Sequence, residues 1–440
     1  MLTRMLSRIS LLSIILTSGA VAGGRYLIRV PSGNIGSVVA RHGLTVDRTL
    51  QGSGKDLFVV RFPEGRDARA LFFDASVQNA EEDGRLLLPE LAAALSPRAS
   101  AQLNLAKPAP LAFYGTQALG SYINQPATDV VWLDGARRLA TGRGIVAVLD
   151  TGVDVKHPVL RDSLVQGYDF TRGVFGGSEM DDLDQSTSTI LDGMQSTSTI
   201  LDKSKTLVLN QSTTAILDQS TSTILDQARE SLPPAFGHGT MVAGLVHLIA
   251  PTAKIMPVKV FNGDGSTTMS QIVDGIYWAV DHGANVINMS FSSTAASKEL
   301  KKAIDYAGSK GVICVASAGN DGKNITVYPA GYGVVGVGST NNWLVRSSFS
   351  NFGSSVTVGA PGEGVITLFP ANNYAAAWGT SFSAPLVAGG AALLVQLADK
   401  TNQSQAARAL SAAWPLPGQQ LGAGEVNMSW ACIYRLTHRN

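Results

Sequence analysis

One stretch decides the fold: Gly379-Thr380-Ser381-Phe382-Ser383-Ala384-Pro385, followed without a break by the small-residue apolar run from Leu386 to Leu397. A proline fits the first turn of a helix, where its missing N–H costs no hydrogen bond, so we expect Ser381 at or just before a helix N-terminus. That end of a helix carries free N–H groups and partial positive charge, which suits an oxyanion next to a serine. Alone, the stretch is better interpreted as an ordinary N-cap, so a catalytic role for Ser381 depends on partners elsewhere in the chain.

Two other stretches provide candidate partners for Ser381. A continuous apolar run from Gly144 ends at Asp150, which is typical of a buried parallel strand followed by a functional loop. In Gly237-His238-Gly239-Thr240, glycines flank one histidine, and a helix of small residues is predicted to follow. A serine hydroxyl becomes a nucleophile when a base lies at hydrogen-bonding distance and a third group orients that base. Asp, then His, then Ser is the chain order of the subtilisin form of this triad.

These motifs, with Ala318-Gly319-Asn320 between the last two, resemble those of the subtilisin-like serine proteases over roughly residues 130–432. The resemblance implies that Ser381 is the nucleophile, that His238 is the general base and then acid, and that Asp150 is the orienting carboxylate. It also implies that Asn320 donates a side-chain hydrogen bond to the oxyanion.

The pattern of apolar runs predicts an α/β fold. Strand patterns alternate with helical ones, as they do in a mostly parallel sheet with helices on both faces. The expected strands are Ile145–Leu149, Ile255–Val260, Val286–Ser290 and Val312–Ala316, and the expected helices are Gln271–His282 and Lys298–Ser309. Together with the resemblance, this predicts a three-layer αβα domain of the subtilisin type over residues 131–435.

Substrate contacts follow from the same resemblance. Ser290, Phe291 and Ser292 match the edge where relatives pair the substrate backbone as an added strand, Gly265 matches the opposite wall, and Gly319 precedes the oxyanion donor. The family usually has Leu-Gly in place of Phe291-Ser292, so we expect a narrower side-chain pocket.

We expect no metal ion and no cofactor. The helix after His238 runs directly into Ala250-Pro251, without the longer loop that binds calcium in many relatives, so no metal is predicted there. The other histidines of the protease region, His157, His247 and His282, are interpreted as structural.

The N-terminal part of the chain predicts export and maturation. Arg4 and Arg8, an apolar run and Ala20-Val21-Ala22 are typical of a signal peptide, residues 1–22, and the run is too short to span a membrane. Residues 23–95 form a small α+β pattern that resembles an inhibitor-type propeptide, with an independent accessory domain as the alternative, and residues 96–130 are predicted to be a linker. The mature form is expected to be secreted, extracellular or periplasmic, with no membrane span.

A repeat-containing insertion occupies residues 175–230, between Asp150 and His238. The octet Gln-Ser-Thr-Ser-Thr-Ile-Leu-Asp occurs at 185–192, 195–202 and 219–226, with a variant at 211–218. One Ile-Leu pair per octet offers little to bury. We therefore favour a flexible or loosely stranded surface excursion over a stacked solenoid, which remains open.

Composition narrows the classes of function. With 440 residues and a net charge of +1, the chain is long enough for two or three units and has no general attraction to nucleic acid. Its two cysteines, Cys314 and Cys432, allow one bridge, but Cys314 lies in an apolar strand pattern that favours a buried free thiol.

The leading interpretation is a secreted serine endopeptidase that cleaves protein or peptide substrates through an acyl-enzyme and is inhibited by its own propeptide. A catalytically idle subtilisin fold that binds partners through the repeats is the alternative. An esterase or lipase requires Gly-x-Ser-x-Gly and the order Ser, acid, His, and the chain has neither.

Overall fold

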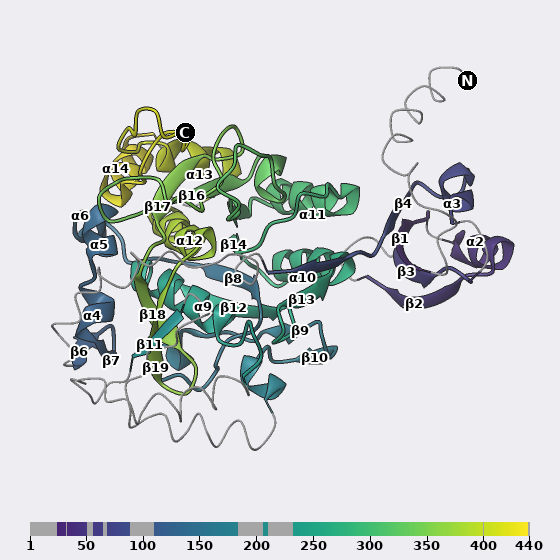
Figure 1. Cartoon of the computed structure of the whole chain (residues 1–440), viewed down its shortest axis with the longest axis horizontal. Helices are drawn as coiled ribbons and strands as arrows, with labels where there is room; N and C mark the ends of the chain where they lie inside the picture. The colour runs from purple at the N-terminus through teal and green to yellow at the C-terminus, as the bar shows by residue number, and fades with distance from the viewer. Residues whose placement is uncertain are drawn as a thin grey trace. The chain divides into compact units, whose positions relative to one another are not determined.

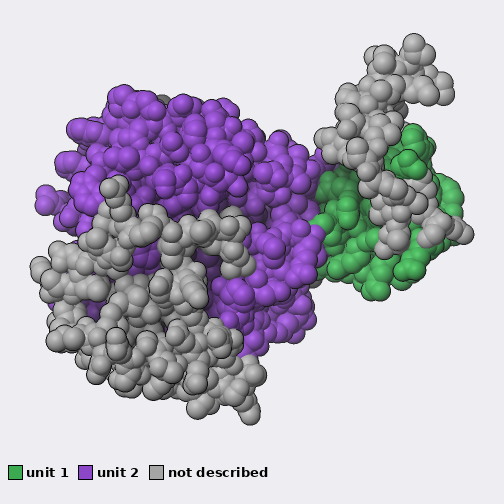
Figure 2. Space-filling model, viewed as in Figure 1, with its two compact units in different colours: residues 1–84 green, residues 85–440 purple. Residues whose placement is uncertain are grey.

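The computed structural model describes residues 24–88 apart from 32, 51–55 and 65–67, then 110–183, 206–209, and 232–438 apart from 399. The chain divides into two compact units, residues 1–84 and residues 85–440 (Figures 1 and 2). The predicted signal peptide lies outside the described residues.

The described residues of the first unit form a four-stranded antiparallel sheet with two helices, in the strand order β2-β3-β1-β4. Its elements are β1 (Arg25–Arg29), α2 (Ile35–His42), β2 (Thr45–Thr49), β3 (Leu57–Arg61), α3 (Ala70–Phe73) and β4 (Asn79–Glu82). Alternate strand residues such as Ile28 and Val60 are buried against Val38 of α2 and Leu71 of α3. The unit ends at Gly84 rather than at residue 95, because residues 85–88 belong to a sheet of the second unit.

The second unit is built on an eight-stranded sheet with the order β10-β9-β12-β8-β14-β15-β16-β17. All neighbouring strands are parallel except β10, which runs antiparallel to β9. The strands are β8 (Ile145–Asp150), β9 (Tyr168–Asp169), β10 (Val174–Phe175), β12 (Lys254–Lys259), β14 (Val286–Met289), β15 (Ile313–Ser317), β16 (Val335–Thr340) and β17 (Val358–Pro361). The mostly parallel sheet predicted from the sequence is confirmed.

Helices cover both faces of this sheet (Figure 1). Val146 and Val148 of β8 share one core cluster with α9 (His238–Ile249) and α12 (Thr380–Leu397). Leu149 points to the other face, where a Cβ on Gly275 of α10 (Met269–Asp281) would lie 3.7 Å from its Cδ2. Successive strand side chains alternate between faces, so α9 and α12 form one layer, and α10 with its neighbour α11 (Lys298–Ser309) forms the other. This is the three-layer αβα arrangement.

Helix α12 lies against α9 in the interior. A Cβ on Gly389 would lie 2.6 Å from the Cβ of Ile249, so the glycine permits the close approach of the two helices. Among the described helices, α12 is long and apolar enough to cross a membrane, but 83% of its apolar window is buried inside the unit. Its apolar character is that of a core helix.

The expected linker is wrong for residues 110–130, which are folded onto the second unit. They form the hairpin β6 (Pro110–Phe113) and β7 (Thr116–Leu119), then α4 (Gly120–Ile123) and α5 (Pro126–Val130). Phe113, Leu119 and Tyr122 are buried in the main core cluster, and the Tyr122 hydroxyl donates to the carbonyl of Gly244 at 2.7 Å. These buried apolar side chains hold the segment in place.

Two small sheets and six further helical segments complete the described part of the second unit. Strand β11 (Thr206–Leu209), inside the repeat insertion, pairs antiparallel with β19 (Asn373–Ala377), which in turn pairs with β18 (Val365–Phe369). The octets themselves lie outside the described residues. Strand β5 (Arg85–Leu87) pairs antiparallel with β13 (Ser266–Thr268). The remaining elements are α6 (Leu133–Arg137), α13 (Gln403–Leu410), α14 (Met428–Thr437) and the 3₁₀ turns η3 (Arg161–Ser163), η4 (Glu179–Asp182) and η6 (Ala330–Tyr332).

Candidate active site

Asp150 and His238 meet at the carboxyl edge of the parallel sheet. Asp150 is the last residue of β8, and His238 is the first residue of α9. His238 Nδ1 lies 2.6 Å from Asp150 Oδ1, and both side chains are buried. The backbone N–H of Thr151 donates to the same carboxylate oxygen at 2.7 Å, which fixes the carboxylate plane. The imidazole is therefore held in a single orientation by an ionisable partner.

Glycines let the two loops pass close enough for this contact. A Cβ on Gly239 would lie 1.9 Å from the carbonyl oxygen of Gly152, so no larger residue fits there. Gly237, just before His238, has φ +88°, and its Cβ position falls 2.3 Å from the ring of Phe369. Left-handed backbone and close approach both require glycine, which explains the glycines around His238.

Ser381 is the second residue of α12, as the sequence predicts for a helix start. Its Oγ donates to the carbonyl oxygen of Ser290 at 2.9 Å. The Ser290 hydroxyl donates in return to the carbonyl oxygen of Ser381 at 2.8 Å. The rings of Phe382 and His238 lie 5.3 Å apart, which places His238 against the residue that follows Ser381.

Pro385 lies inside α12 and not in its first turn, which corrects the expectation from the sequence. A residue at this position would normally donate its N–H to the carbonyl four residues earlier, that of Ser381. Proline has no N–H, so the Ser381 carbonyl is left to accept from Ser290. The proline thus favours the two reciprocal hydrogen bonds between Ser381 of α12 and Ser290, which follows β14.

Asn320 follows β15 and lies at the same edge of the sheet. Its Oδ1 accepts hydrogen bonds from the backbone N–H and the hydroxyl of Thr380, both at 2.9 Å. The Thr380 hydroxyl also accepts from the N–H of Gly319 at 3.1 Å. These bonds commit the amide oxygen to Thr380, so the amide nitrogen is turned the other way. Sequence analysis missed Thr380, although its position next to Ser381 in the motif was the available signal.

The two predicted substrate walls come from separate loops. On one side, Phe291 is buried with its ring 5.4 Å from that of Phe261, and a Cβ on Gly319 would lie 3.0 Å from Ser292 Oγ. On the other side, the carbonyl of Gly265 accepts from the N–H of Leu88 at 3.0 Å. Residues 85–88 thus continue the edge of β13 as an added antiparallel strand.

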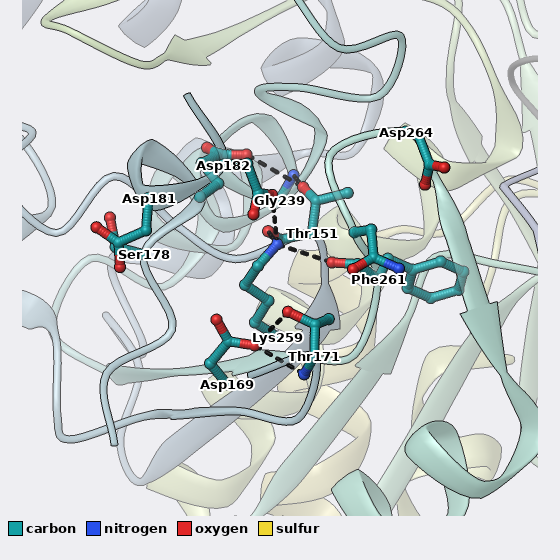
Figure 3. Close-up of polar contacts among 12 residues, drawn as sticks. Thr151, Asp169, Thr171, Ser178, Asp181, Asp182, Gly239, Lys259, Phe261 and Asp264 are labelled. Carbon is teal, nitrogen blue, oxygen red and sulfur yellow. Dashed lines mark hydrogen bonds and ion pairs between the residues drawn. The ribbon is translucent and has the colours of Figure 1, made fainter. Parts of the chain in front are cut away.

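A buried lysine lies behind the Asp150 loop. Lys259 is fully buried and pairs in register with Asp150 across the sheet. Its Nζ donates to the carbonyls of Thr151 at 2.7 Å and Phe261 at 2.8 Å, and forms an ion pair with Asp182 at 2.6 Å (Figure 3). A buried charge is tolerated when it is paired and hydrogen-bonded. Sequence analysis did not single out Lys259, because its partners come from distant segments.

The histidines interpreted as structural are packed. Burial lowers the pKa of His157 to about 4, and Val159 N–H donates to its Nδ1 at 3.3 Å. Burial also lowers the pKa of His247 to about 4, and its ring packs edge-on against Phe113 at 5.5 Å. His282 ends α10, with Nδ1 2.8 Å from the carbonyl of Trp278.

Cys314 and Cys432 are both buried and free. Burial raises the pKa of each thiol to about 12, so both are held as neutral thiols in the core. Within the described residues, no group of three or more His, Cys, Asp or Glu side chains is arranged to hold a metal ion.

Most of the second unit matches a protein-family model. A model described as "Subtilase family" matches residues 142–421, more than half of the chain. The chain belongs to the subtilase family. This subtilase is 39% identical over 211 residues to Subtilisin DY of Bacillus licheniformis, covering 44% of this chain and 77% of that protein. It is 33% identical over 269 residues to Thermophilic serine proteinase of Bacillus sp. (strain AK1), covering 61% of this chain and 55% of that one.

Solved structures show the same fold. Fervidolysin from Fervidobacterium pennivorans matches with a TM-score of 0.66 and 23% identity, over 95% of this subtilase and 62% of that chain. A protease from Pseudoalteromonas arctica matches with a TM-score of 0.53 and 28% identity, over 69% of this chain and 94% of that chain. These structures show the subtilisin-like fold, and the family match with its curated relatives shows that this subtilase is a serine endopeptidase.

Proposed function

We propose that this subtilase hydrolyses peptide bonds through Ser381, His238 and Asp150. His238 takes the proton from Ser381 Oγ as the hydroxyl attacks the scissile carbonyl, and returns it to the leaving amine. Water then hydrolyses the acyl-enzyme by the same route. The observation that carries the proposal is the 2.6 Å bond between His238 Nδ1 and Asp150, which leaves Nε2 as the nitrogen for proton transfer.

We propose that Asn320 and the backbone N–H of Ser381 form the oxyanion hole. The commitment of Asn320 Oδ1 to Thr380 supports this, because it makes Nδ2 the outward donor. The N–H of Ser381 belongs to the first turn of α12, where backbone donors have no helical acceptor. Donors aimed at the developing oxyanion are typically the largest catalytic contribution.

Protein or peptide substrates are proposed to bind as an extended strand between the two walls. Ser290, Phe291 and Ser292 form one wall, Gly265 the other, and Gly319 lies beside them. The pairing of β5 with β13 supports this, since an extended segment already adds to that edge. We further propose that residues 23–95 are a propeptide whose residues 85–88 block this wall until maturation.

Secretion is part of the proposal. It rests on the basic, apolar and small-residue pattern of residues 1–22. The repeats are proposed to select large substrates or to attach the enzyme to a partner. The alternative function, a catalytically idle binding protein, is tested with the same probe as catalysis.

The test is labelling with a serine-reactive fluorophosphonate probe. The processed enzyme should be labelled, and Ser381→Ala should abolish labelling and peptide hydrolysis. Ser383→Ala is a matched control in the same helix turn, because Ser383 is buried and its hydroxyl donates to the Pro361 carbonyl. Labelling that persists in Ser381→Ala contradicts the assignment of the nucleophile. An unlabelled but folded and processed enzyme favours the idle binding protein.

A further inference from the structure

Glu179 is a fully buried carboxylate that the catalytic proposal does not use. It is the first residue of η4 and lies directly against the Asp150 loop. A Cβ on Gly152 would lie 2.8 Å from the backbone nitrogen of Glu179, and the N–H of Val153 donates to the carbonyl of Gly177 at 2.9 Å. The segment that carries Glu179 therefore packs onto the loop that follows the catalytic strand.

The Glu179 carboxylate accepts hydrogen bonds from the residue next to Asp150 and from residues on either side of His238. Oε2 accepts from the hydroxyl of Thr151, the residue after Asp150, at 3.1 Å. Oε2 also accepts from the N–H of Gly237, the residue before His238, at 2.9 Å, and Oε1 accepts from the hydroxyl of Thr240. One side chain thus connects the end of β8 to the first turn of α9.

The donors around Glu179 are committed to it. The Thr151 hydroxyl accepts from the N–H of Gly239 at 2.9 Å, and the Thr240 hydroxyl accepts from the N–H of Asp154 at 2.7 Å. Each hydroxyl thus accepts one hydrogen bond and donates its single proton to Glu179. Three donors converge on the two oxygens of the ionised group, whereas the NH₂ group of an amide would replace one of these acceptors by a donor.

The electrostatic setting is also specific. Burial raises the pKa of Glu179 to about 8, while the hydrogen bonds from Thr240 and Thr151 and the charge of Lys259 lower it. Lys259 donates to the carbonyl of the same Thr151, and Figure 3 shows its ammonium group turned toward Thr151 and Phe261. Glu179 also lies at the N-terminus of α9, where partial positive charge favours a carboxylate.

We propose that Glu179 is a positioning residue: it clamps Thr151 to the residues that flank His238 and thereby sets the hydrogen bond between His238 and Asp150. The inference rests on the proposed function, because it matters for catalysis only if His238 is the base. Proton transfer depends steeply on geometry, and a misplacement of about 1 Å can cost about 100-fold in rate. Substrate binding involves other loops, so loss of the Glu179 hydrogen bonds should lower kcat and leave KM nearly unchanged.

The test is Glu179→Gln in the full-length chain, with kcat and KM measured on a small peptide above pH 8, where Glu179 is ionised, for the processed, folded enzyme. We expect kcat to fall by about 10- to 100-fold with KM changed less than about twofold. Glu425→Gln is the matched control. Glu425 is also buried, burial also raises its pKa to about 8, and it lies in the C-terminal turn beside Gly359. Its variant should retain the kcat of the parent.

A second pair of variants covers the case in which Glu179→Gln does not fold. Thr240→Ser keeps the hydroxyl and should retain kcat, whereas Thr240→Val removes one donor to Glu179 and should lower kcat with KM unchanged. The inference is overturned if kcat of the folded Glu179→Gln enzyme stays within about twofold of the parent, or if only its KM rises. It is also overturned if Glu425→Gln lowers kcat as much as Glu179→Gln does. Where Glu179→Gln does not fold, a Thr240→Val enzyme that retains kcat overturns it. Failure of the proposed function is seen separately, as activity that survives Ser381→Ala.

Discussion

The buried ring of His247 predicts a specific loss of stability in acid. Burial is the main cause of its lowered pKa, followed by the charges of His157 and Arg137. The unfolded chain binds a proton at His247 near pH 6.5, and the folded chain does so only near pH 4. The unfolded state therefore holds more protons in this window, and the free energy of unfolding falls as the pH drops from about 6.5 to about 4.

The size of the effect follows from the two pKa values. Between pH 7 and pH 5, His247 should account for a loss of about 2 kcal/mol in the free energy of unfolding, rising to about 3 kcal/mol by pH 4. Replacement by phenylalanine removes the titrating group and keeps an aromatic ring against Phe113. His247→Phe should therefore lose about 2 kcal/mol less than the parent between pH 7 and pH 5.

The assay is urea unfolding at pH 7 and pH 5 in a Ser381→Ala background, which prevents self-digestion. Only the change between the two pH values is compared, so a constant packing difference of the phenylalanine cancels. His438→Gln, at the exposed residue that follows α14, is the control for the loss of a histidine as such. If His247→Phe loses as much stability as the parent, His247 is not held neutral by burial and the reasoning is refuted.

Three further predictions concern the active-site edge of the sheet. Asn320→Ala should lower kcat by about 10²- to 10³-fold with a much smaller change in KM, and steady-state kinetics that show only a KM effect would remove Asn320 from the oxyanion hole. Lys259→Met should lower the free energy of unfolding by about 1–3 kcal/mol, measured in urea, because the buried carbonyls of Thr151 and Phe261 lose their donor; an unchanged midpoint would contradict this. Pro385→Ala should supply an N–H that competes with Ser290 for the Ser381 carbonyl and lower kcat, whereas an unchanged kcat would show that the two reciprocal hydrogen bonds do not depend on the proline.

Local chemistry explains why much of the fold could be predicted. The apolar run before Asp150 has no polar face to expose, so it becomes the buried parallel strand β8. The small residues of α12 likewise predict a helix that packs closely, as Gly389 does against Ile249. The linker prediction fails over residues 110–130 because most of these residues are polar or small. The few side chains that are buried in the core, chiefly Phe113 and Tyr122, do not stand out among them in the sequence.

The family motifs, their order and the elements that carry them could be predicted from the sequence, because strand runs, helix starts and glycine-flanked residues are local signals. The sequence named Asp150, His238, Asn320 and Ser381 as the residues at those positions. That Glu179 connects the loop after Asp150 to the first turn of α9 is seen only in the folded structure. A glutamate in sequence is by default a solvated side chain, and its burial here depends on three donors from two other segments, which become neighbours only when the sheet and α9 come together.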